Sequence, residues 1–208
     1  MNYQMVTKKT IKLNKTHPAE FFITSGVGES NNTIHAGSYH LALKDAGIER
    51  GNIQTYSSML SKYSYKVERD DVPDIDIGQE LQCIISSYNG NDGEFINAGL
   101  AYAYLYKDET SEEHSGGLVV EIAGNFDNET LEEKLRVAIE ELYAGNINSE
   151  SYDIDTEYEK GSFKEQKYLL GHINIHMKGM TISKRYGTVV VAIVFINHIM
   201  EYDNSEIS

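Results

Sequence analysis

The chain of 208 residues contains no tryptophan, one cysteine and only two prolines. A single cysteine, Cys83, excludes an internal disulfide and suits a reducing compartment. Cys83 lies in the apolar stretch Leu81 to Ile85, which favours a buried structural thiol over a nucleophile. Because prolines are few and hydrophobic residues make up 40% of the chain, we expect a packed globular domain rather than a disordered segment.

Positive charge is also scarce, since 18 Lys and Arg face 32 Asp and Glu, giving a net charge of −14. This balance argues against binding of nucleic acid, which requires clustered basic residues, and is compatible with a cationic small-molecule ligand. The longest apolar run, Val189 to Ile196, is too short to span a membrane, and residues 1–15 lack the apolar core of a signal peptide. We expect a cytoplasmic protein without nucleic-acid or membrane partners.

Motifs for metal binding and for triad hydrolysis are missing as well. His172 and His176 are four residues apart, which on one strand would place both on the same face, but no third ligand accompanies them. Two half-exposed strand histidines are therefore the favoured interpretation, and we expect no metal. The Gly-x-Ser-x-Gly elbow of serine hydrolases does not occur.

The apolar pattern predicts about eight strands and two helices in a single α+β domain covering residues 1–208, with the helices on sheet faces. We predict strands at 20–24, 53–56, 63–67, 80–87, 98–106, 117–122, 168–175 and 188–196. The glycine-rich segment Ser25 to Ser30 is interpreted as a tight turn. The segments 88–93 and 149–166 are predicted as turn or loop, and the tail from His198 as frayed.

One helix is predicted over residues 39–46, with Ser38 as its N-cap and Gly47 as its end. A second follows Asp127-Asn128 and ends at Gly145. It is amphipathic because its apolar residues fall at helical spacing in one stripe, formed by Leu131, Leu135, Ala138, Ile139 and Leu142.

The segment Gly51 to Leu60 contains a Ser57-Ser58 bond after a short β-like run. A serine hydroxyl can attack the preceding carbonyl and convert the amide into an ester. Elimination from that ester breaks the chain and leaves dehydroalanine, which hydrolyses to a pyruvoyl group, an electrophilic ketone. The dipeptide alone carries little information, because Ser86-Ser87 repeats it. Our hypothesis is that Ser57-Ser58 is a self-cleavage site.

A carboxyl group at Glu121 follows the apolar residues Gly117 to Val120. Desolvation in such surroundings favours the neutral form of a carboxyl, which suits a general acid. The alternative is a strand residue that faces water. The sequence pattern by itself leaves both interpretations open.

Several segments together resemble the pyruvoyl-dependent arginine decarboxylases, in order and in spacing, over residues 20 to 197. They are Ser25-Gly-Val-Gly-Glu-Ser30, Asp45-Ala-Gly-Ile48, Asn52 to Leu60, Gly93-Glu-Phe-Ile-Asn-Ala98, Gly117-Leu-Val-Val-Glu121 and Tyr186-Gly-Thr-Val-Val-Val-Ala-Ile-Val-Phe195. The resemblance implies a four-layer αββα sandwich that assembles as a homotrimer or a dimer of trimers, with active sites between subunits.

The resemblance further implies a proenzyme that is cut between Ser57 and Ser58 into a β chain, 1–57, and an α chain, 58–208. Ser58 would become the covalent pyruvoyl cofactor. Asn52 matches the residue that assists self-processing, and Glu121 matches the proton donor. The implied reaction is decarboxylation of L-arginine to agmatine and CO₂ through a Schiff base between the pyruvoyl group and the substrate's α-amine, without a metal.

The substrate pocket departs from the family pattern at His40, where the family helix usually carries an aspartate. Histidine cannot offer a guanidinium the bidentate pairing of a carboxylate. Glu49 and Gly51 match positions that line the pocket, and we hypothesise that Glu49, or else one of the carboxylates Glu29 and Asp45, supplies the missing charge.

Two alternatives remain besides arginine decarboxylation. One is the same lyase chemistry on a different amino acid, and the other is an unprocessed, non-catalytic trimer that binds a small cation or a partner. A smaller departure is Ser61, where the family often has a proline, and we expect it to loosen the cleavage loop.

Overall fold

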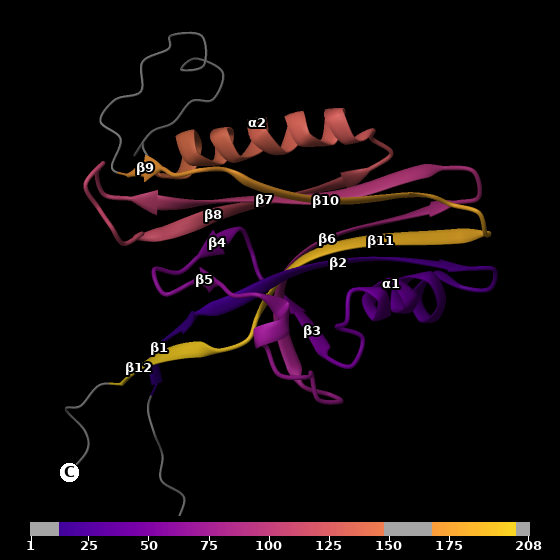
Figure 1. Ribbon diagram of the computed structural model, residues 1–208, viewed down its shortest axis with the longest axis horizontal. Coiled ribbons are helices and arrows are strands. Elements are labelled where there is room, and N and C mark those ends of the chain that lie inside the picture. Colours follow the sequence, from indigo (N-terminus) through magenta and orange to yellow (C-terminus); the bar gives the residue numbers. More distant parts are fainter. Residues whose placement is uncertain (1–12, 148–167, 203–208) are drawn as a thin grey trace, which may run out of the picture.

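The computed structural model describes residues 13–147 and 168–202 and forms a single mixed α+β domain. Two five-stranded sheets lie face to face across most of the molecule (Figure 1). A core of buried side chains from both sheets fills the space between them; its fully buried members include Phe21, Ile84, Ile96 and Leu100. No helix among the described residues is long and apolar enough to cross a membrane.

One sheet, which we call the lower sheet, has the strand order β3-β6-β11-β2-β5. These strands are β3 (Asn52–Thr55), β6 (Glu80–Asn91), β11 (Tyr186–Phe195), β2 (Glu20–Ser30) and β5 (Tyr65–Lys66). β11 lies at its centre, because it pairs antiparallel with both β2 and β6. Its run of Val, Ala and Ile is almost wholly buried, as expected of a strand covered on both faces.

The predicted turn at Ser25 to Ser30 is wrong, because these residues continue β2 and pair with β11 as far as Tyr186. The glycines are there for a close helix contact instead of a turn. A Cβ atom on Gly26 would lie 2.2 Å from the Ala42 carbonyl oxygen, and one on Gly28 would lie 2.2 Å from that of Ser38. The sequence pattern for a flexible turn and for a close backbone approach is the same.

The other sheet, the upper sheet, has the order β10-β7-β8-β4, and β9 also pairs with β7. Its strands are β4 (Met59–Leu60), β7 (Phe95–Tyr106), β8 (Gly116–Gly124), β9 (Leu169–Leu170) and β10 (Asn174–Thr181). The predicted turn at 88–93 is too long, because β6 runs to Asn91 and only Asp92 and Gly93 turn toward β7. Gly93 has a φ of 81° there, a conformation that favours glycine.

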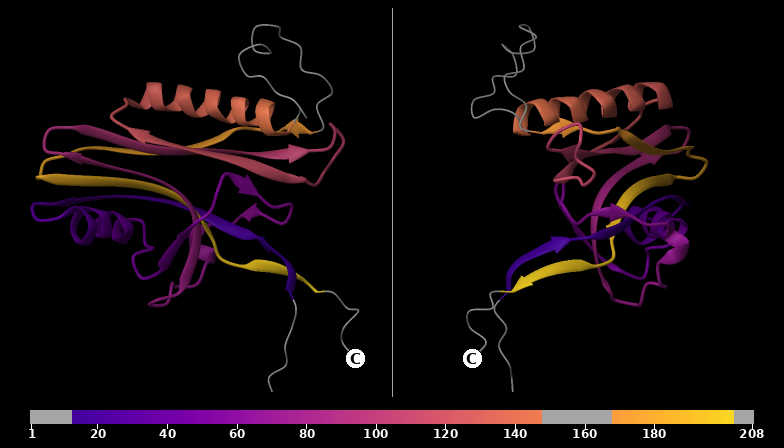
Figure 2. Two further views of the ribbon diagram at one scale, coloured as in Figure 1. Left: turned by 180° about the vertical axis from the view of Figure 1, so that it is seen from behind. Right: turned by 60° about the vertical axis from the view of Figure 1, so that its left-hand side comes forward.

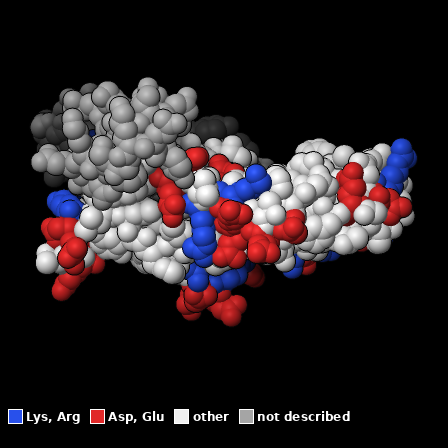
Figure 3. Space-filling model, turned by 90° about the horizontal axis from the view of Figure 1, so that it is seen from above, with Lys and Arg blue, Asp and Glu red and all other residues white. Residues whose placement is uncertain are grey.

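The long helix α2 (Asn128–Ile147) packs on the outer face of the upper sheet. The predicted apolar stripe is confirmed, since Leu131, Leu135 and Ile139 are fully buried against β7 and β8. The helix does not end at Gly145 but continues to Ile147. Viewed from above, acidic and basic side chains lie next to one another on this face (Figure 3), and the Arg136–Glu132 pair of α2 is one such contact, at 2.8 Å.

A shorter helical segment packs on the outer face of the lower sheet. It begins as a π-helix, η1 (Ile34–Tyr39), and continues as α1 (His40–Asp45). Ser38 is therefore not the predicted N-cap. It lies within the helical segment, fully buried, and its Oγ forms a 2.8 Å hydrogen bond with Oγ1 of Thr188 on β11.

The strands β1 (Leu13–Pro18) and β12 (His198–Tyr202) pair as a two-stranded ribbon that extends away from the sheets (Figure 2). The tail from His198 is thus ordered to Tyr202, contrary to our prediction, because β1 satisfies its backbone groups. A short 3-10 turn, η2 (Arg69–Asp71), follows β5. The predicted loop at 149–166 lies outside the described residues.

Candidate active site

The Ser57-Ser58 link crosses from one sheet to the other, because β3 belongs to the lower sheet and β4 to the upper. Hydrogen bonds hold the chain on either side of it. The N–H of Tyr56 donates to the Cys83 carbonyl on β6 at 2.8 Å, and the N–H of Val119 on β8 donates to the Ser58 carbonyl at 2.9 Å. The segment that contains the candidate bond is therefore a short connection held by one sheet at each end.

This connection is a tight turn of three residues, 57–59. The N–H of Met59 donates to the Ser57 carbonyl oxygen at 2.8 Å, an i to i+2 hydrogen bond that defines a γ-turn centred on Ser58. Ser57 is exposed and Ser58 is half-buried. The carbonyl that a Ser58 hydroxyl would attack thus has a donor on its oxygen and is open to solvent.

The second serine pair has a different setting. Ser86 and Ser87 lie inside β6, where they pair with Val191 and Val190 of β11. The Ser86 hydroxyl donates to the Ile122 carbonyl on β8 at 2.9 Å. Cleavage there would divide a long paired strand, whereas cleavage at Ser57-Ser58 divides only a connection.

Glu121 lies on β8 two residues beyond Val119, whose N–H binds Ser58. Residues i and i+2 of a strand share a face, so Glu121 points to the same side as the fully buried Val119, toward the space between the sheets. Its side chain is exposed in the single chain, yet partial burial by neighbouring protein raises the pKa of its carboxyl group. The structure thus places a carboxyl group with a raised pKa two residues along β8 from Val119, the residue that binds the Ser58 carbonyl.

Asn52 is at the opposite end of β3 from the serine pair. Its Nδ2 donates to the Gly78 carbonyl at 3.1 Å, and the strand alone puts about 10 Å between Asn52 and Thr55. Within one chain, Asn52 therefore does not contact the Ser57 carbonyl. Gly51 lies beside it, packed so closely that a Cβ would lie 2.2 Å from Cδ1 of Leu81.

The predicted substrate residues His40 and Glu49 lie at the start of α1 and just after its end. His40 is the first residue of the helix and is exposed. Glu49 follows the helix, is half-buried, and lies 4.0 Å from Nε of the exposed Arg50. That distance is at the limit of an ion pair, so the Glu49 carboxylate keeps capacity for another cation.

The other two candidate carboxylates already have backbone partners. Glu29 accepts hydrogen bonds from the N–H and hydroxyl of Ser183 and from the N–H of Lys184, which lower the pKa of Glu29. Asp45 accepts the N–H of Val27 at 3.0 Å. Both line an open depression of about 550 Å³.

This depression is remote from the serine pair within one chain. Pairing across the lower sheet connects Thr55 with Cys83, Cys83 with Val194, and Val194 with Phe22. Glu29 is seven residues farther along β2 than Phe22, about 23 Å at strand spacing. One amino-acid substrate therefore cannot touch both places within a single chain.

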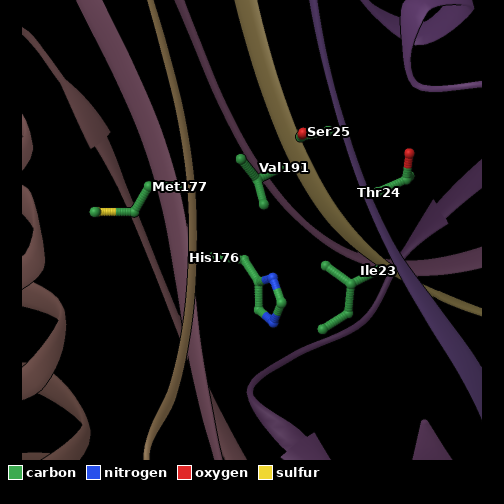
Figure 4. Close-up of a pocket in the computed structure, with 6 residues that line it drawn as sticks. All are labelled: Ile23, Thr24, Ser25, His176, Met177 and Val191. Carbon is green, nitrogen blue, oxygen red and sulfur yellow. The ribbon is translucent and has the colours of Figure 1, made fainter.

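A smaller cavity of about 310 Å³ opens between β2 and β10, lined by residues of both sheets. Figure 4 shows the ring of His176 directed toward Ile23, while Met177 points the other way. His176 stacks on Tyr102 with ring centroids 6.2 Å apart, and burial lowers the pKa of its imidazole. His172 precedes β10 and is exposed, so the two histidines do not share a strand. No metal-binding group of three or more His, Cys, Asp or Glu occurs among the described residues.

Cys83 is fully buried on β6, and burial raises the pKa of its thiol to about 12, which agrees with a structural cysteine.

Ser61 anchors the loop after β4. Its hydroxyl donates to the Pro18 carbonyl at 2.5 Å and accepts the N–H of Tyr63, and its N–H donates to Ser64. A proline could not donate that last bond, so serine has its own means of holding this loop.

Comparison with known proteins identifies the family. Residues 20–200 match the family described as pyruvoyl-dependent arginine decarboxylase. The chain belongs to this family. A pyruvoyl-dependent arginine decarboxylase of Thermoplasma volcanium is 28% identical over 182 residues, covering 84% of this chain and 93% of the relative. One from Methanocella arvoryzae is 28% identical over 148 residues, covering 67% and 88%.

A shorter match, to pyruvoyl-dependent arginine decarboxylase 1 of Archaeoglobus fulgidus, is 35% identical over 88 residues, covering 41% of this chain and 55% of the relative. The family match therefore covers almost all of the residues that the structure describes. It includes both sheets, both helices and the link between β3 and β4.

Proposed function

We propose that this protein is a pyruvoyl-dependent decarboxylase that acts on L-arginine to give agmatine and CO₂. The observation that carries the proposal is the family match over residues 20–200. The substrate enters the proposal from the names of the relatives. An acidic chain with a net charge of −14 is compatible with a cationic substrate.

The prosthetic group in this proposal comes from Ser58. Self-cleavage separates residues 1–57 from residues 58–208, and the exposed γ-turn at Ser57-Ser58 supports this assignment, because the bond can break without disrupting a sheet. Ser58 supplies all the carbon atoms of a pyruvoyl group, and its carbonyl is already held by Val119. The residues present therefore fit the group.

A pyruvoyl group supplies an electrophilic ketone for the substrate's α-amine and, next to it, a carbonyl that accepts the electron pair left by CO₂. The chain's own residues do the rest. The N–H of Val119 orients the residue-58 carbonyl and stabilises negative charge on its oxygen. Glu121, with its raised pKa, holds a proton for the former α-carbon.

Substrate recognition in this proposal uses Glu49 for the guanidinium, since Glu29 and Asp45 are bound to backbone N–H groups. Because His40 and the depression beside α1 are remote from Ser58 within one chain, the complete site needs residues from a second copy. This is why we propose the four-layer αββα sandwich as the subunit of a trimer or of a dimer of trimers. His40 also favours a second candidate, the same lyase reaction on another amino acid.

The intact mass of the purified protein tests the processing. We expect two polypeptides, 1–57 and 58–208, the second lighter by one ammonia than the chain with a free serine and blocked to N-terminal sequencing. Ser58→Ala should remain one chain, and Ser87→Ala should cleave normally. A wild-type chain that stays intact after prolonged incubation would support a non-catalytic binding protein instead.

An amino-acid panel tests the substrate. The cleaved protein is incubated with arginine, lysine, ornithine, histidine, aspartate and glutamate, and CO₂ and amine are measured. Turnover of arginine with release of agmatine is the expected result. Turnover of another amino acid but not of arginine would replace arginine in the proposal.

A further inference from the structure

We propose that the backbone N–H of Met59 is the oxyanion donor for self-cleavage of the Ser57-Ser58 bond. This inference rests on the proposed self-processing and adds the group that promotes it. The carrying observation is the 2.8 Å hydrogen bond from Met59 N to the Ser57 carbonyl oxygen. The N–H is therefore already directed at the oxygen that takes the negative charge, and effective oxyanion donors lie about 2.7–3.1 Å from that oxygen in the transition state.

The N–H of Met59 has no other use in the strand pairing. β4 pairs antiparallel with β8, with Met59 opposite Leu118. In such a pair, hydrogen-bonded and non-hydrogen-bonded positions alternate. Because Val119 donates to the carbonyl of Ser58, Met59 occupies a non-hydrogen-bonded position, and its N–H points away from β8.

The surrounding contacts keep this donor on the carbonyl. Tyr56 is tied to Cys83 of the lower sheet, and Ser58 is tied to Val119 of the upper sheet. The peptide between Ser57 and Ser58 is thus held between two sheets that cannot move independently, since a common core joins them. Preorganised donors of this kind stabilise charge without reorganising during the reaction.

The chemistry can be followed atom by atom. The Ser58 hydroxyl oxygen adds to the Ser57 carbonyl carbon, and the carbonyl oxygen takes the negative charge beside the N–H of Met59. The C–N bond then breaks, and the nitrogen takes the hydroxyl proton. Ser57 is left as an ester of the Ser58 hydroxyl, and Ser58 has a free amine.

Loss of the Ser58 α-proton then expels the Ser57 carboxylate, and dehydroalanine remains. Water hydrolyses its imine tautomer to pyruvoyl and ammonia, so the sequence needs no oxidant or reductant. Met59 N–H acts at the first step, in which charge develops on the Ser57 oxygen. Asn52, the residue that the family resemblance associates with processing, binds Gly78 in this chain.

The test removes only the Met59 N–H. In one variant, suppressor-directed incorporation replaces Met59 by its α-hydroxy acid, which keeps the side chain and converts the amide into an ester. A second variant is Met59→Pro, which also lacks the donor and spares the ladder. Met59→Leu, which retains the N–H, is the matched control. Precursor is made by cell-free synthesis, and cleavage is followed over time by intact mass, with thermal unfolding as a check on the fold.

We expect the α-hydroxy-acid variant and Met59→Pro to cleave about 100- to 1,000-fold more slowly than Met59→Leu, the usual effect of losing one oxyanion donor. Cleavage of the α-hydroxy-acid variant at the rate of Met59→Leu would overturn the inference, whatever Met59→Pro does. Failure of the proposed self-processing gives a different result. In that case the wild-type chain itself would remain intact, and the inference would fail with it.

Discussion

Single residues differ in what the fold does to their chemistry. Glu121 and Glu29 are both strand carboxylates, but desolvation raises the pKa of Glu121, whereas hydrogen bonds from Ser183 and Lys184 lower that of Glu29. A carboxyl that must hold a proton needs desolvation, which favours its neutral form. A carboxylate that fixes a turn needs hydrogen-bond donors, which favour its charged form. The two glutamates are therefore suited to different tasks.

The raised pKa of Glu121 gives a pH dependence with a definite sign. A proton donor is active while protonated, so turnover should fall as pH rises through the raised pKa of Glu121, and this dependence should disappear in Glu121→Gln. Loss of a general acid typically lowers kcat by about 100- to 10,000-fold.

The measurement is a pH profile of turnover for chains whose cleavage has been verified by mass. Glu133→Gln, an exposed change on α2, is the matched control and should leave the profile unchanged. Wild-type kcat in cleaved Glu121→Gln would exclude Glu121 as the donor.

Recognition of the substrate can be tested at Glu49 and His40. Glu49→Gln should lower kcat/KM for arginine by about 10- to 100-fold, since hydrogen bonds between charged groups contribute about 1.5–3 kcal/mol. His40→Asp should raise it, because a carboxylate can pair with a guanidinium through two hydrogen bonds.

Steady-state kinetics with arginine provide the readout, and Asp45→Asn is the comparison. An effect at Asp45 alone would assign guanidinium binding to Asp45 instead of Glu49.

Among the secondary-structure elements, β2 shows how a helix fixes a strand's composition. Gly26 and Gly28 leave room for the backbone of η1 and α1 to lie directly on the strand. That contact fixes α1, which begins at His40 and precedes Glu49, against β2. Two glycines that suggest a turn in the sequence therefore position the helix that carries candidate substrate residues.

Gly28→Ala should destabilise the protein by about 1–3 kcal/mol or more, because its Cβ would collide with the backbone of Ser38 and Ala42. Ser25→Ala, on the same strand, removes only a half-buried hydroxyl and should have little effect. Denaturant unfolding of the two variants measures the difference. Equal stabilities would mean that α1 moves away from β2 at little cost.

At the scale of the whole molecule, cleavage would separate the covalent chain but not the fold. Residues 1–57 contain β1, β2, α1 and β3. β2 is paired with β11 from Phe21 to Ser30, β3 with β6, and β1 with β12. Each of the three strands described in the first piece is thus bound to a strand of the second.

We therefore expect the cleaved protein to elute from gel filtration at the same volume as uncleaved Ser58→Ala. Two bands should appear only on a denaturing gel. Native mass spectrometry would give the number of copies as well. A free 1–57 piece under native conditions would contradict this prediction.

The sequence determined the α+β class, the amphipathic stripe of α2, the buried thiol and the family, because each depends on local periodicity or on an ordered set of short segments. It did not determine the roles of Gly26 and Ser38 or the strand that begins at His198. Each of those depends on a partner distant in the sequence, namely α1, Thr188 and β1.

For the serine pair, the sequence supplied the hydroxyl groups, and the tertiary structure separated Ser57-Ser58 from Ser86-Ser87. The first pair bridges two sheets in a γ-turn, and the second is locked inside β6. The donor on the Ser57 carbonyl is a backbone N–H, which every residue except proline has. Only the pairing of β4 with β8 leaves the N–H of Met59 free to act there, so no residue pattern could have identified it.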